Sequence, residues 1–101
     1  MSDLGNDIRL VVDTGKVSIG YRNVLRSISN TSANAVVVAS KGNTELINDI
    51  KHMCNIASVK VITFDGNPTE LGALCGKPFS VNALAVLEQG SSKILTEDYG
   101  V

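Results

Sequence analysis

Aromatic residues are scarce in this sequence, which has no tryptophan, two tyrosines and two phenylalanines among 101 residues. Apolar residues still make up 44% of the chain, so its core must be built mainly from Val, Ile, Leu and Ala. Such side chains suit strands that are covered by helices. A chain of this length is expected to form one domain, residues 1–101, that buries roughly 65% of the surface exposed by its unfolded chain. One hydrophobic core can therefore form without disulfides or a metal.

Cysteine and histidine are also scarce, and their spacing argues against redox or metal chemistry. Cys54 and Cys75 lie 21 residues apart and are interpreted as buried, reduced thiols, with a disulfide between them as the alternative. The single histidine, His52, should lie on the flank or surface of a helix, and no carboxylate is placed to orient it as a general base. One histidine and two distant cysteines fall short of the ligands that zinc requires. We expect no metal site and no cofactor.

Long apolar runs, an N-terminal leader and nucleotide-binding motifs are missing too. No stretch approaches the ~20 apolar residues of a membrane span, which predicts a soluble, cytoplasmic protein without a membrane partner. Neither G-x-G-x-x-G nor G-x-x-x-x-G-K-[ST] occurs. Asp65 lacks the acidic companions of a magnesium site, and Asp65-Gly66 is typical of a turn. These absences predict a protein that is not an enzyme and has no small-molecule substrate.

The net charge of −1 is low for a nucleic-acid-binding protein, but the charge is unevenly distributed. Between Ile8 and Asn30 four basic residues, Arg9, Lys16, Arg22 and Arg26, face one acidic residue, Asp13, a local balance of +3. From Val61 to the end the balance is −3. Because a partner is attracted by a face rather than by the total charge, the chain could present a positive face. The alternative is a mixed, solvated surface.

Apolar periodicity predicts helices and strands in strict alternation. Helices are expected at 3–13, 21–29, from 44 and from 68, and strands at 16–19, 35–39, 59–64 and 82–87. The continuously apolar stretch 35–39 is typical of a strand that is covered on both faces. Short connections in this order predict an α/β fold, a three-layer α/β/α sandwich with a central four-stranded mixed sheet.

Several residues mark the ends and faces of these elements. Asn43 is expected to cap the third helix, and Pro68 should open the fourth helix, which Gly76 ends. A short edge element could follow at Ile94-Leu95. The apolar residues on one side of the third helix are Leu46, Ile50, Met53 and Cys54.

The start of the second helix, Gly20-Tyr21-Arg22-Asn23, carries groups suited to phosphate. A helix N-terminus offers free N–H groups and partial positive charge. Arg22 adds a planar donor fork, and Arg26 projects from the same helical face. The alternative is an ordinary helix start with surface arginines, which would show the same residues.

Two further turns could contact an RNA. In Lys77-Pro78-Phe79-Ser80 the proline stiffens a loop that could present Phe79 to an unpaired base, although a ring folded into the core is the alternative. The glycines of the Gly66–Gly72 junction allow a close backbone approach. A basic group, a stackable ring and glycine-backed helix starts together are typical of proteins that hold folded RNA with splayed bases.

Five short segments stand in order along the chain: Thr14-Gly15-Lys16-Val17, Gly20-Tyr21-Arg22, Glu70-Leu71-Gly72, Gly76-Lys77-Pro78-Phe79 and Ala83-Leu84-Ala85-Val86. They resemble the L-thirty-e family, the kink-turn-binding ribosomal proteins of the large subunit in archaea and eukaryotes. The resemblance runs from about Ile8 to Leu95, and the Lys77-Pro78-Phe79 form is similar to archaeal members. It implies a sandwich that recognises the kink-turn, a sharply bent internal loop flanked by sheared G·A pairs.

By this resemblance, three neighbouring loops at one end of the sandwich grip the RNA. The RNA-binding residues that it implies, together with Arg26, are Gly20, Tyr21, Arg22, Asn23, Lys41, Gly66, Asn67, Thr69, Glu70, Lys77 and Phe79. Phe79 matches a family aromatic that stacks on a base. The chain departs from the family at Lys41, where relatives usually carry an RNA-contacting asparagine, and at Leu46, where some carry an arginine. A lysine meets phosphate but cannot make a two-sided amide contact.

These observations predict a structural component of the large ribosomal subunit, located on the cytoplasmic ribosome, that binds kink-turn rRNA. Its expected partners are rRNA and neighbouring large-subunit proteins, and it should be monomeric when free. One alternative is a kink-turn binder outside the ribosome. Another is a protein-interaction module with reduced RNA affinity, which the net charge and Lys41 would favour.

Overall fold

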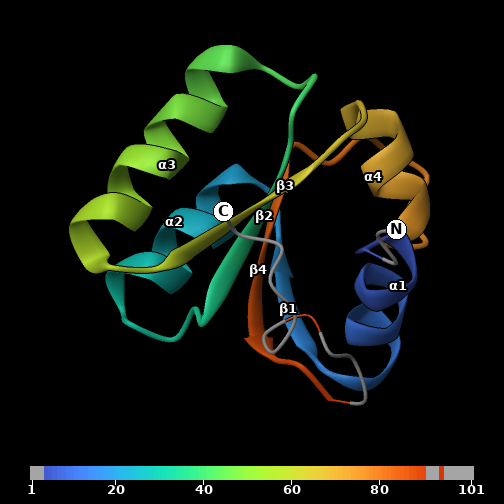
Figure 1. Cartoon of the computed structure of the whole chain (residues 1–101), viewed down its shortest axis with the longest axis horizontal. Coiled ribbons are helices and arrows are strands. Elements are labelled where there is room, and N and C mark those ends of the chain that lie inside the picture. Colours follow the sequence, from blue (N-terminus) through green and yellow to red (C-terminus); the bar gives the residue numbers. More distant parts are fainter. Residues whose placement is uncertain (1–3, 91–93, 95–101) are drawn as a thin grey trace.

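The computed structural model describes residues 4–90 and Ile94. Helices and strands alternate along this part of the chain: α1 Leu4–Thr14, β1 Lys16–Ile19, α2 Tyr21–Ser29, β2 Ala35–Ala39, α3 Thr44–Ala57, β3 Lys60–Phe64, α4 Pro68–Leu74 and β4 Ala83–Glu88 (Figure 1). The order is the predicted one, although β3 and β4 each begin one residue later than expected. Ile94 lies in a turn, and Leu95, the other residue of the expected edge element, lies outside the described residues. In residues 4–90, no helix has both the length and the apolar character to cross a membrane.

The strands form one sheet between two helical layers, which confirms the predicted α/β/α sandwich. Helices α2 and α3 cover one face of the sheet, and α1 and α4 cover the other (Figure 1). The strand order is β1-β4-β2-β3, with β2 parallel to β3 and β4 antiparallel to both β1 and β2. The sheet is therefore mixed, as predicted.

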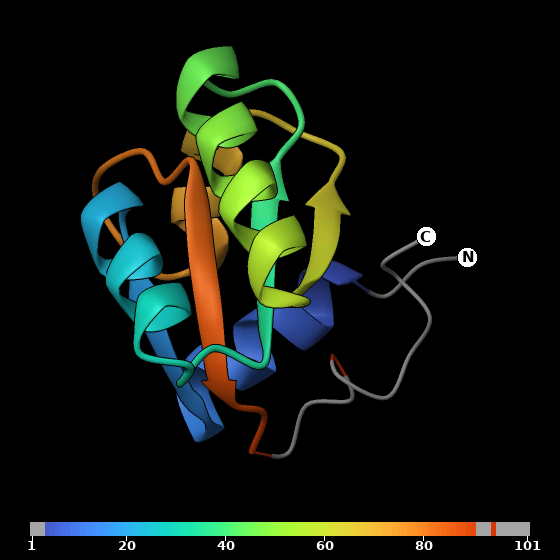
Figure 2. The same cartoon turned by 90° about the vertical axis from the view of Figure 1, so that its left-hand side faces the viewer.

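This topology gathers four chain segments at one edge of the sheet. Because only β4 runs in the opposite direction, the C-terminal ends of β1, β2 and β3 lie beside the N-terminal end of β4. In Figure 2 this is the upper edge, toward which β2 and β3 point and from which β4 descends. We call it the rim and define it by residues 20–23, 40–43, 65–67 and 77–82. The rim is where short loops can present side chains from rigid supports.

Strand β2 is buried along its whole length, which confirms the prediction that both of its faces are covered. Because side chains alternate along a strand, its residues divide between two hydrophobic clusters. Val37 packs on the side of α1 and α4, whereas Val36 and Val38 pack on the side of α2 and α3. The resulting core on both faces holds the rim in place.

Helix α3 begins where Asn43 was expected to cap it. The Asn43 side chain accepts a hydrogen bond from the backbone N–H of Leu46 at 3.1 Å. Started there, the helix turns Ile47, Ile50 and Cys54 toward the sheet, at the three- and four-residue spacing of one face. The prediction that Leu46 belongs to the buried side was wrong, because Ile47 takes that position and Leu46 is only half-buried.

Both cysteines are buried free thiols, which confirms their interpretation and excludes the disulfide between them. Burial raises the pKa of each thiol from 9.0 to about 11, although the charge of Lys77 opposes part of the rise at Cys75. At pH 8 only about one thiol in a thousand would then be ionised. His52 is exposed, as expected.

We expect neither thiol to react with iodoacetamide in the native protein at pH 8, and both to react once the chain is unfolded in denaturant. Mass spectrometry of the alkylated protein checks this. Folding raises the pKa of each thiol, so the protonated thiols contribute to the stability of the folded protein. This contribution is complete below pH 9 and is lost as the pH rises toward 11. Rapid alkylation of the native protein at pH 8 would contradict the burial of the thiols.

Candidate nucleic-acid interface

Backbone hydrogen bonds join the loops of the rim across the sheet. Each bond links one strand end or loop to the next in the order β1, β4, β2, β3: Gly20 N to Ala83 O at 3.3 Å, Ala39 N to Asn82 O at 2.9 Å, Ser40 N to Phe64 O at 2.9 Å and Lys41 N to Gly66 O at 3.0 Å. Every strand end therefore positions its neighbour. The structure brings the three predicted turns to one edge, although the first and the last of them are about sixty residues apart in the chain.

The loop between β1 and α2 leaves the helix start open. Gly20 stands at the N-cap with φ of +100°, a conformation that favours glycine, and it provides no side chain to cap the helix. Val24 N bonds to Gly20 O, but the N–H groups of Tyr21, Arg22 and Asn23 receive no side-chain cap. These groups face the rim with the positive end of the helix dipole, which is the arrangement that attracts phosphate.

Side chains of the first turn of α2 are positioned differently from one another. The Tyr21 hydroxyl donates to Asp49 Oδ2 at 3.1 Å and so ties α2 to α3. Desolvation, together with the hydrogen bond and charge of Asp49, raises the pKa of Tyr21 above its ordinary 10.0. Asn23 Nδ2 donates to Ile19 O at 3.0 Å. Arg22 is exposed and free to turn toward a ligand, and Arg26 is exposed one helical turn further on.

Phe79 is presented to solvent, with 57% of its surface exposed, which excludes a ring folded into the core. The loop is clamped to α4 by two backbone bonds, Lys77 N to Gly72 O and Val81 N to Pro68 O, both at 2.9 Å. Gly72 packs so closely that a Cβ there would clash with the carbonyl oxygen of Phe79. With its backbone held against the helix, the loop directs the ring outward.

A cavity of about 600 Å³ lies between β1, the start of α2 and the loop that precedes β4. Its polar and aromatic lining comes from Ser18, Tyr21, Asn23, Lys77, Phe79, Ser80 and Asn82. The volume falls in the range typical of small-ligand sites. A cavity with a stackable ring, a cation and amide groups can accept an unpaired nucleobase.

Asn82 is a site residue that the sequence analysis missed, because it was interpreted only as the first residue of a strand. It lies in the middle of the rim, and its side-chain oxygen accepts from Asn43 N at 2.8 Å. Gly42 is close to the same oxygen, so that a Cβ at Gly42 would clash with it. The two partners are 39 residues apart, so no local pattern could reveal the contact.

In the β3–α4 junction, two of the predicted RNA-binding residues are engaged with each other. Asn67 Oδ1 accepts from Glu70 N at 2.8 Å, and Glu70 Oε1 accepts from Asn67 N at 2.9 Å, a capping box that opens α4 with Pro68 at its first turn. Gly66 is buried, whereas Thr69 is exposed. The junction therefore has a rigid backbone, with Thr69 as its exposed side chain that has no part in the capping box.

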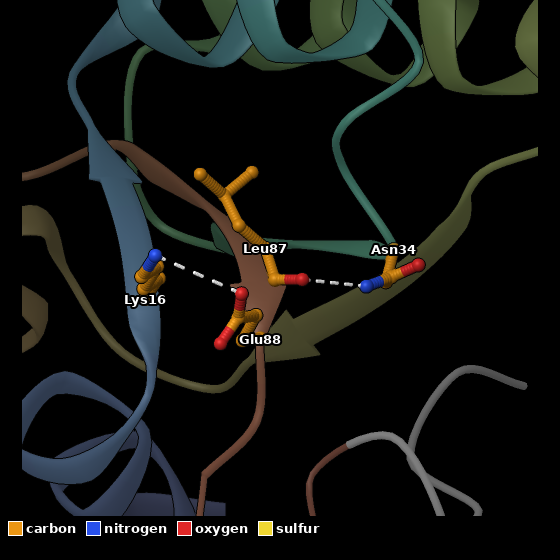
Figure 3. Close-up of polar contacts among 4 residues, drawn as sticks. All are labelled: Lys16, Asn34, Leu87 and Glu88. Carbon is orange, nitrogen blue, oxygen red and sulfur yellow. Dashed lines mark hydrogen bonds and ion pairs between the residues drawn. The ribbon is translucent and has the colours of Figure 1, made fainter.

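The basic residues between Ile8 and Asn30 do not form one face, so of the two options left by their local charge the mixed surface is correct for this segment. Arg9 lies on α1, across the sheet from Arg22, and Lys16 lies at the edge opposite the rim. Lys16 pairs there with Glu88 at 3.8 Å, beside the bond from Asn34 Nδ2 to Leu87 O at 2.6 Å (Figure 3). The positive charge of the rim comes instead from three separate segments: Arg22 lies in the first turn of α2, and Lys41 and Lys77 lie in two loops.

The chain matches a protein-family model described as the Ribosomal protein L7Ae/L30e/S12e/Gadd45 family, over residues 2–96. It is 40% identical to the large ribosomal subunit protein eL30 of Archaeoglobus fulgidus, over 88% of this chain and 99% of that protein. It is 38% identical to eL30 of Methanothermobacter thermautotrophicus, over 92% and 95% of the two chains. With eL30 of Methanobrevibacter smithii it shares 34% identity over 96% and 98%. The resemblance carried by the short motifs is therefore confirmed over nearly the whole chain.

Proposed function

The chain belongs to the Ribosomal protein L7Ae/L30e/S12e/Gadd45 family, and on that premise we propose that it is a structural component of the large ribosomal subunit that binds kink-turn rRNA. The named relatives are archaeal large-subunit proteins that match this chain end to end, which supports a place on the cytoplasmic ribosome rather than catalysis. The observation that carries the RNA-binding role is the convergence of an uncapped helix start, three cations and an exposed ring on one rim.

Each part of the rim has a separate task in this proposal. The N–H groups at the start of α2 bind phosphate, and Arg22 and Arg26 add charge-assisted hydrogen bonds. Phe79 stacks on an unpaired base, with Lys77 beside it on the sugar-phosphate backbone. The rigid junction that holds Gly66 and Thr69 contacts the bent RNA backbone through its complementary shape. Lys41 contacts phosphate where relatives carry an asparagine.

Charge alone contributes less here than in a strongly basic protein. The rim carries Asp65 beside its cations, Glu45 follows it in the first turn of α3, and the whole chain has a net charge of −1. A shallow dependence of affinity on salt is therefore expected, since few counterions are released. Preorganised shape and stacking must supply most of the selectivity.

The proposed function is tested by titrating the protein with a kink-turn RNA and with a control in which the G·A pairs are replaced. The kink-turn should bind much more tightly than the control, because only the bent form matches the spacing of the three loops. Equal binding of the two RNAs, or none, would refute kink-turn recognition and would favour a protein-interaction module.

Replacing Arg22 with alanine should weaken binding to all kink-turns alike, because the lost contact is to phosphate. The slope of log affinity against log salt concentration should become flatter by about 1. Titration at several salt concentrations measures it. Arg9→Ala is the matched control, since Arg9 is an exposed arginine on α1, away from the rim, and its loss should leave the slope unchanged. A slope that changes equally in both variants would place Arg22 outside the interface.

A further inference from the structure

The side chain of Asn82 is held in one orientation by the neighbouring loop. Its Oδ1 accepts a hydrogen bond from Asn43 N at 2.8 Å, and the backbone carbonyl of Asn82 accepts one from Ala39 N at 2.9 Å. A backbone N–H can only donate, so the atom that faces Asn43 must be the oxygen of the amide. The amide nitrogen therefore lies on the other side, and the group cannot flip without losing a bond.

The amide nitrogen of Asn82 is available to a ligand. It donates to none of the residues that the structure describes, and among these residues no buried side-chain nitrogen or oxygen lacks a partner. The nitrogen must therefore reach solvent. Asn82 lines the 600 Å³ cavity together with Phe79 and Tyr21, so this cavity is open space beside Asn82 that a ligand could occupy.

Tyr21 also lines the cavity, but its hydroxyl is already engaged on α3. It gives its proton to Asp49, so its remaining capacity is to accept. Asn82 is therefore the residue of this lining whose donor is fixed in orientation and is not bonded to a described residue. Fixed donors and acceptors are how a site discriminates between base edges.

We propose that Asn82 is a specificity-determining residue of this site, whose amide nitrogen donates to an acceptor atom of the unpaired base that stacks on Phe79. The inference rests on the proposed function and adds a contact that reads a base. The acceptor is a ring nitrogen or a carbonyl oxygen of the base, since the amide nitrogen can only donate.

One variant, Asn82→Asp, separates the donor from its structural anchor, and two further variants serve as comparisons. Asn82→Asp keeps an oxygen for Asn43 N but replaces the donor by a second, charged acceptor, so it should fold normally and bind kink-turn RNA more than about tenfold more weakly. Asn82→Ala removes the donor and the oxygen that bonds Asn43 N, without adding charge, and should weaken binding about three- to tenfold. Ser80→Asp places the same charge elsewhere in the cavity and should cost less than Asn82→Asp. Thermal unfolding of each variant measures stability separately.

Abasic substitution of each unpaired kink-turn nucleotide then identifies the partner. At one nucleotide, loss of the base should weaken binding by the wild type but weaken binding by Asn82→Ala much less. Additive losses at every nucleotide, or wild-type affinity in both Asn82 variants, would overturn the inference. The inference would also be overturned if the effect of Asn82→Ala on affinity depended on replacing a phosphate of the RNA and not on removing a base. Failure of the wild type to prefer the kink-turn over its control would instead refute the proposed function, and this inference with it.

Discussion

Replacing Phe79 with alanine should weaken kink-turn binding by about 1–3 kcal/mol, or five- to 150-fold, because the ring that stacks on an unpaired base is lost. The fold should remain intact, since 57% of the side chain is exposed and little buried surface disappears with it. Titration of the RNA and thermal unfolding of the free protein measure the two effects separately.

Ile56→Ala is the matched control for Phe79→Ala. Ile56 is another large, exposed apolar residue, 65% exposed, but it lies near the C-terminal end of α3, whereas the rim lies at the start of that helix. Its truncation should change neither RNA affinity nor the unfolding temperature appreciably. An unfolded Phe79→Ala protein, or an equal loss of affinity in both variants, would show that the ring does not serve as a specific contact.

Replacing Gly72 with alanine should both destabilise the protein and weaken RNA binding. The added Cβ would clash with the carbonyl oxygen of Phe79, which belongs to backbone rather than to a flexible side chain. Forcing such an atom into a packed contact costs about 1–3 kcal/mol, in spite of the ~1 kcal/mol that alanine gains over glycine inside a helix. The unfolding temperature should fall by several degrees. RNA affinity should fall as well, because the loop that carries Phe79 must move.

Gly5→Ala gives the comparison that isolates this clash. Gly5 is also a helical glycine, but a Cβ there would meet only the end of Leu74, at 3.8 Å, an ordinary contact. This variant should be as stable as the wild type or slightly more so, with unchanged RNA binding. If Gly72→Ala behaves in the same way, the close packing of α4 against the loop has no role in presenting the ring.

Much of the fold could be predicted from local pattern. The bounds of β1, α2 and β2 were predicted correctly, because turn residues and apolar periodicity act within a few residues of the chain. The Asn43 cap and Pro68 start follow from the same kind of short-range chemistry. Even so, the buried face of α3 was assigned to Leu46 instead of Ile47, since neighbouring apolar residues leave the rotation of a helix open.

The candidate site could be predicted only in part. Its loops were identified by glycine, basic and aromatic residues, and the outward position of Phe79 was one of two options that the structure decided. The charge pattern between Ile8 and Asn30 could not decide between a positive face and a mixed surface, because residues close in sequence lie on opposite layers and opposite edges of the sheet. Asn82 was missed because its role depends on a contact across 39 residues.

The sequence by itself determined the alternation of helices and strands, their caps and the family to which the chain belongs. These features arise from interactions within one or two turns of the chain and from motifs in a linear order. Only the tertiary structure decided the strand order β1-β4-β2-β3, the meeting of four loops at the rim and the fixed direction of the Asn82 amide. The physical reason is that strand pairing and side-chain contacts join residues far apart in sequence, and a linear pattern does not encode which distant partners meet.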